Sequence, residues 1–116
     1  MISRDLRQAL VGAIRHSNFS RYEVAGRLSE LLGREVSKYV LDRWLAESAE
    51  ESRIPAEAVA PLCQILSTIE PLTILARSLQ CVVLEPAQAR EMQILKLRIQ
   101  RQEIDRQLQA LEGEVK

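Results

Sequence analysis

Apolar residues recur every three or four positions along most of this sequence, which is the spacing of one face of an α-helix. The first segment, 3–16, shows it most simply, because its large apolar residues are four positions apart. They are Ile2, Leu6, Leu10 and Ile14. We therefore predict an N-terminal helix over 3–16 with one buried face.

Clear start and stop signals bound a second helix, predicted over 21–32. Ser20 is a favourable N-cap residue, and Glu23 three positions later completes a capping box. Gly33 is well suited to the left-handed conformation that commonly ends a helix. The residues predicted to face inward are Val24, Ala25, Leu28, Leu31 and Leu32.

A third helix is predicted from Lys38 to Glu47, with Ser37 as its N-cap. Its apolar face comprises Val40, Leu41, Trp44 and Leu45. At 100° per residue, the opposite face comprises Tyr39, Asp42, Arg43 and Ala46, with Lys38 at its edge.

Prolines divide the next part of the chain, because proline suits the first turn of a helix and not its interior. We predict a short helical turn from Pro55, a helix over 60–67 and a fifth helix opened by Pro71, with Leu79 on its apolar face. The segment 80–85 is short and contains β-branched residues, and it is predicted to form a strand or an extended link. Cys63 and Cys81 lie among apolar residues and are predicted to be small core side chains.

The last helix is predicted to run from Pro86 nearly to the end of the chain. Apolar residues at heptad a and d positions favour a short two-helix coiled coil with a second copy, and Arg101 interrupts them. The alternative is a single helix folded back on its own domain. The dimerisation residues predicted from this pattern are Ile94, Leu97, Ile104, Leu108 and Leu111.

Composition supports an all-helical chain of 116 residues, since 47% of them are hydrophobic but only 3% are aromatic. We predict a helical domain over 1–80 and a dimerisation helix with its link over 81–116. The net charge is zero, but residues 1–43 hold eight basic and five acidic residues, a net +3. An anion-binding surface is therefore expected in this first part.

Several classes of function find no support in the sequence. No apolar run is long enough for a membrane span, and the N-terminus lacks a signal region. Two cysteines make no disulfide framework, which favours a cytoplasmic protein. No phosphate loop, metal-ligand cluster or paired nucleophile and base is present. We expect no enzyme activity, no cofactor, no metal and no small-molecule substrate.

Two helices joined by a short connection, the second with a free polar face, form the layout of a helix-turn-helix. The apolar face of the second helix anchors it, so that its other face can enter the major groove of DNA. Positive helix N-termini and nearby cations favour phosphates. Ser37 and Lys38 at the helix start fit this role, and Arg34 and Arg21 are expected to contact phosphates on either side.

The chain resembles the lambda-repressor-like helix-turn-helix family, and within it the small regulators of Mu-like and related phages. The matching segments, which fall within residues 3–80, are SRYEVA at 20–25, LGREVSKY at 32–39, LDRW at 41–44, RIPAE at 53–57 and LC at 62–63. This resemblance implies a five-helix domain, here followed by the long C-terminal helix, that binds operator DNA as a homodimer. It also implies that Tyr39, Asp42 and Arg43 contact bases, and that Ser20, Arg21, Arg34, Ser37 and Lys38 contact the DNA backbone.

A second hypothesis is a protein–protein interaction module that retains the helix-turn-helix scaffold without binding DNA. The neutral total charge and the acidic segment 47–51 favour it. A continuous basic surface from Arg21, Arg34, Lys38 and Arg43 favours DNA binding instead. Neutralisation of those cations by Glu35 and Asp42 favours the interaction module.

Overall fold

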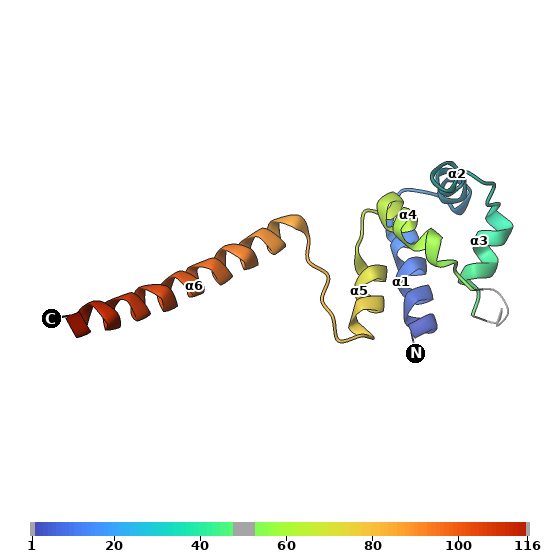
Figure 1. The fold of residues 1–116 in the computed structure, drawn as a ribbon. Coiled ribbons are helices and arrows are strands. Elements are labelled where there is room, and N and C mark those ends of the chain that lie inside the picture. Colours follow the sequence, from blue (N-terminus) through green and yellow to red (C-terminus); the bar gives the residue numbers. More distant parts are fainter. Residues whose placement is uncertain (1, 48–52, 116) are drawn as a thin grey trace. The chain divides into compact units, whose positions relative to one another are not determined.

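The protein is all-helical in the residues that the structure, a computed structural model, describes, namely 2–47 and 53–115 (Figure 1). The chain divides into two compact units, Met1–Val83 and Leu84–Lys116. The first unit contains five helices and the second contains one. The helices are α1 (Ile2–His16), α2 (Arg21–Leu32), α3 (Lys38–Leu45), α4 (Ala56–Leu66), α5 (Glu70–Arg77) and α6 (Pro86–Val115).

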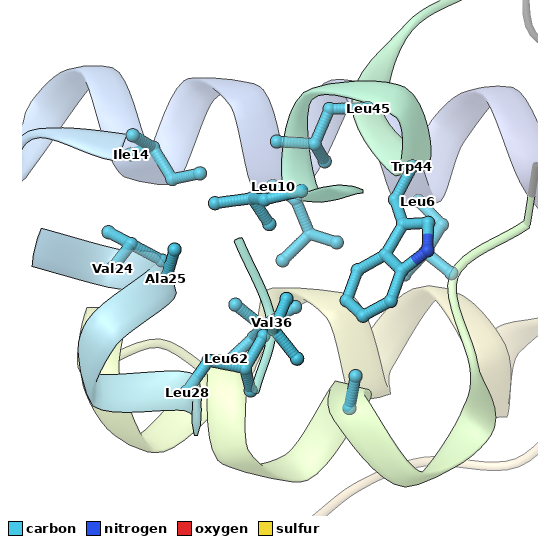
Figure 2. Packing of buried hydrophobic residues seen from close by; sticks show 12 residues of the cluster. Leu6, Leu10, Ile14, Val24, Ala25, Leu28, Val36, Trp44, Leu45 and Leu62 are labelled. Atoms are coloured by element: carbon cyan, nitrogen blue, oxygen red, sulfur yellow. The ribbon is translucent and has the colours of Figure 1, made fainter. Parts of the chain in front are cut away.

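A single aliphatic core joins the helices of the first unit. Side chains from α1, α2, α3 and α4 converge on it, as Figure 2 shows. The predicted face of α1 is confirmed at Leu6, Leu10 and Ile14, which are its buried residues, but Ile2 is 47% exposed. The ring of Trp44 lies beside Leu6 in this core (Figure 2). Burial of such side chains removes apolar surface from water, which is the main force stabilising a small domain.

The predicted ends of α2 are confirmed. Ser20 accepts a hydrogen bond from the backbone N–H of Glu23, and the Glu23 carboxylate accepts one from the backbone N–H of Ser20. Gly33 adopts φ 69°, a left-handed conformation that glycine reaches without steric cost. Leu31, predicted to face inward, is 47% exposed.

The link between α2 and α3 is fixed by a side chain of α2. The hydroxyl of Ser29 accepts a hydrogen bond from the backbone N–H of Val36 at 2.8 Å and donates to the carbonyl of Ala25 at 2.7 Å. Val36 itself is only 3% exposed and belongs to the core. The five residues 33–37 can therefore connect the helices in one defined conformation.

Helix α3 begins at the predicted residue and ends two residues earlier than predicted. Ser37 accepts a hydrogen bond from the backbone N–H of Val40, and Ala46 is the C-cap in an extended conformation. The guanidinium of Arg7, on α1, donates to the carbonyl of Ala46 at 2.8 Å. This contact satisfies a carbonyl that the helix end leaves unpaired, and it ties α3 to α1.

The prediction of a separate turn at Pro55 and a helix over 60–67 is wrong. One helix, α4, runs through both segments, with Pro55 at its N-cap and Pro61 inside it. Proline at 61 gives up the hydrogen bond to the carbonyl of residue 57. The helix persists because its buried residues on either side of Pro61 pack as one face. They are Ala58, Val59, Leu62 and Cys63.

Helix α5 opens at Glu70 with Pro71 in its first turn. Leu79, predicted on its apolar face, lies beyond the helix and is 76% exposed. Residues 81–85 form a link without regular secondary structure, and the described residues contain no strand. Cys63 is buried as predicted, but Cys81 is exposed, so its predicted place in the core is wrong.

Helix α6 forms the second unit, and none of its described side chains is buried. The predicted interface residues, spaced by three and four, follow one side of it, and Arg101 lies among them at the a position of their heptads. The opposite side holds the ion pair between Arg106 and Glu103, at 2.7 Å. The residues predicted to form the interface are all exposed, namely Ile94, Leu97, Ile104, Leu108 and Leu111. None of the described helices has the length and apolar character needed to cross a bilayer.

Candidate nucleic-acid interface

Helix α3 turns its polar side outward from the core. Leu41, Trp44 and Leu45 are buried on one side, while Tyr39 on the other is 67% exposed. Arg43 is exposed beside Tyr39, with its guanidinium carbon 5.9 Å from the ring centroid. An Arg43 N–H also donates to the Tyr39 hydroxyl at 3.4 Å. The two predicted base-contacting residues thus form one exposed pair.

Asp42, the third predicted base-contacting residue, lies between two cations. Its Oδ1 atom is 2.7 Å from Nη1 of Arg21, and its Oδ2 atom is 2.7 Å from Nζ of Lys38. These hydrogen bonds, first that from Lys38 and then that from Arg21, hold the pKa of Asp42 below its ordinary value. The hydrogen bond between Lys38 and Asp42 also raises the pKa of Lys38 above its ordinary value. In the free protein, Asp42 therefore connects the first residue of α2 to α3.

This three-residue cluster (Arg21, Lys38 and Asp42) retains a net charge of +1, because two cations surround one carboxylate. Its exposed neighbour is Tyr22, which is 72% exposed, with its ring centroid 5.2 Å from Nζ of Lys38. Arg43 on α3 adds a further positive charge. Together with Tyr39, these residues form a surface with an excess of positive charge and two exposed aromatic rings.

Arg34 forms its ion pair with an unexpected partner. Its Nη2 atom lies 2.8 Å from Oε1 of Glu57, on α4, rather than pairing with Glu35. Both side chains are about half exposed. This pair attaches the α2–α3 link to α4 and compensates the charge of one predicted backbone contact.

The predicted contacts Ser20 and Ser37 both serve as N-caps. Each hydroxyl oxygen accepts one backbone N–H, and each hydroxyl proton is left to donate. The two serines mark the N-termini of α2 and α3, where unpaired backbone N–H groups attract anions.

Sequence reasoning missed Tyr22 and the arginines of α1. Tyr22 could have been recognised from the sequence, because it is adjacent to Arg21 and does not belong to the buried face of α2. The acidic segment 47–51 lies, apart from Glu47, outside the described residues. The described residues hold no group of three or more His, Cys, Asp or Glu that could bind a metal.

Comparisons with protein-family models, with curated proteins and with solved structures give no match to this chain.

Replacing Asp42 with asparagine is expected to lower the free energy of unfolding at neutral pH by about 1 kcal/mol or less. The effect is small because the three side chains are about one-third exposed, and ion pairs at such exposure are weak. Since folding lowers the pKa of Asp42 from 3.8, its contribution is complete above about pH 4 and is lost as the pH falls through the folded pKa.

Urea denaturation of both proteins at neutral pH and at about pH 2 checks this expectation. The difference between Asp42→Asn and the parent protein should shrink on acidification. A difference that stays constant would show that the Asp42 charge does not contribute to stability.

Proposed function

We propose that this protein is a sequence-specific DNA-binding regulator of the lambda-repressor-like, phage type, and that it binds operator DNA through α3. One observation carries the proposal. The apolar side of α3 is fixed in the core by Leu41, Trp44 and Leu45, while Tyr39 and Arg43 on its other side are exposed. A helix that presents a fixed, positively charged polar face meets the physical requirement for major-groove recognition.

The dimensions of α3 suit this role. A helix with its side chains is about 10–12 Å across, which fits the major groove of B-DNA, about 12 Å wide. Arg43 can donate two hydrogen bonds to guanine, and Asp42 can accept one from cytosine if it exchanges a cation for a base. Tyr39 contributes a hydroxyl and a ring edge at the same surface.

Dimerisation through α6 completes the proposal. A lone helix with an exposed apolar stripe gains stability when a second copy covers that stripe. Two copies of the domain can then bind half-sites about 34 Å apart on the duplex. A two-fold symmetric operator is the expected target.

Replacing Arg43 with alanine is expected to weaken specific DNA binding by about 1–3 kcal/mol and to relax base preference at one position of each half-site. Selection from random duplex DNA, followed by affinity measurement on the selected site, measures both effects. Arg77→Ala is a matched control, because Arg77 is an exposed arginine at the end of α5. Unchanged affinity and preference in Arg43→Ala would remove Arg43 from the interface.

A protein–protein interaction module is the second candidate, and one observation favours it. Arg21 and Lys38 share Asp42, and Arg34 pairs with Glu57, so carboxylates compensate much of the predicted basic surface. The two candidates differ in their response to salt. A DNA-binding protein loses affinity steeply as salt rises, whereas failure to bind duplex DNA at low salt would favour the interaction module.

A further inference from the structure

A groove rich in arginine lies beside the proposed interface. It has a volume of about 400 Å³ and is formed by α1, the first residue of α2 and the end of α3. Its arginines are Arg4, Arg7, Arg15 and Arg21. Arg4 and Arg15 are eleven residues apart on α1, which is close to three full helical turns, so they share one side of the helix about 16 Å apart along its axis.

The positive charge of this groove is only partly compensated. Glu47 is the one carboxylate in its described lining, against four guanidinium groups. Within the described chain, Arg4 and Arg15 form no ion pair and no side-chain hydrogen bond, and both are exposed. Arg7 donates to the carbonyls of Ala46 and Glu47, and no carboxylate among the described residues pairs with it. A strong local attraction for anions follows.

Arg21 belongs both to the groove and to the ion pair with Asp42 of α3. The groove and the exposed side of α3 therefore meet at this residue. An extended anion that begins at Arg21 can continue along α1 past Arg7 to Arg4 or Arg15.

We propose that this groove binds successive phosphates of one DNA strand, next to the bases that α3 contacts. The inference rests on the proposed function and adds a second contact surface to it. Guanidinium groups are planar donors that match phosphate oxygens in pairs. Phosphates of one strand follow one another at about 3.4 Å along the duplex axis, so a duplex lying along α1 offers several of them over the distance between Arg4 and Arg15. Val11 and Leu45 are the large apolar side chains that line the groove. The groove therefore offers little apolar surface against which an apolar peptide could pack.

The test replaces Arg4 and Arg15 together with alanine in the full chain. Both side chains are exposed on a helix, and alanine favours helices, so the variant keeps its fold. Binding to a 30-base-pair duplex of random sequence is measured over a range of salt concentrations. We expect affinity to fall about ten-fold, and the slope of log affinity against log salt to lose about 0.9 for each phosphate contact removed.

The control is Arg77→Ala combined with Arg90→Ala, which removes the same charge from the protein outside the groove. If the parent binds the duplex and Arg4→Ala/Arg15→Ala matches it in affinity and slope, the groove proposal is overturned and the α3 proposal stands. If both double variants lose affinity equally, net charge rather than the groove is responsible, and the groove proposal is again overturned. If the parent fails to bind any duplex, the proposed function and the groove proposal fall together.

Discussion

Replacing Leu41 with alanine is expected to cost about 2–5 kcal/mol of the free energy of unfolding, because this side chain is completely buried and its truncation leaves a cavity in the core. Leu41 is also one of the residues that fix α3. The same variant is therefore expected to lose DNA binding, even though Leu41 has no access to DNA.

Chemical denaturation followed by tryptophan fluorescence measures the effect on stability. Trp44 is the only tryptophan of the chain, and it is buried on the same side of α3 as Leu41. Tyr39→Ala is the matched control, because it truncates an exposed side chain on the other side of α3. It should change stability by less than about 0.5 kcal/mol. Equal destabilisation by the two variants would contradict the assignment of the two sides of α3.

Replacing Leu97 and Leu108 together with aspartate is expected to convert a dimer into a monomer. The proposed dimer would bury these four leucines, and the variant would place four charges at its interface instead. The dissociation constant of the dimer should rise by more than about 100-fold, which sedimentation equilibrium measures directly.

Ile99→Asp is the control for this change. Ile99 is as exposed as Leu97, but it lies about 200° from Leu97 around α6, on the opposite side. This variant should remain dimeric. A parent protein that is monomeric at all concentrations, or a control that dissociates as readily as the double variant, would refute pairing through the a and d residues.

The sequence predicted most helices well because their ends carry chemical signals. Ser20 with Glu23, Ser37 and Gly33 fix helix boundaries through local hydrogen bonds and backbone conformation, and such interactions need no knowledge of the fold. The prediction of two separate segments around Pro61 was wrong, because the local preference against proline inside helices takes no account of tertiary packing. Val59 and Leu62, on either side of Pro61, are both buried in the core.

The candidate site was less predictable for the same reason. The outward side of α3 follows from helical spacing, so Tyr39 and Arg43 were recognisable from the sequence. The ion pairs could not be recognised from the sequence. Arg21 and Asp42 are separated by 21 positions along the chain, and Arg34 and Glu57 by 23 positions. Only packing of the helices brings those charges together.

Arg7 gives the two proposed contact surfaces a shared support. Its guanidinium lines the groove and also donates to the carbonyl at the end of α3. A strand seated in the groove would consequently set the depth and the register of α3 in the neighbouring duplex. The side chains of α3 would then contact the base pairs at one fixed position on the duplex. An operator sequence shifted by one base pair would place the wrong bases against these side chains.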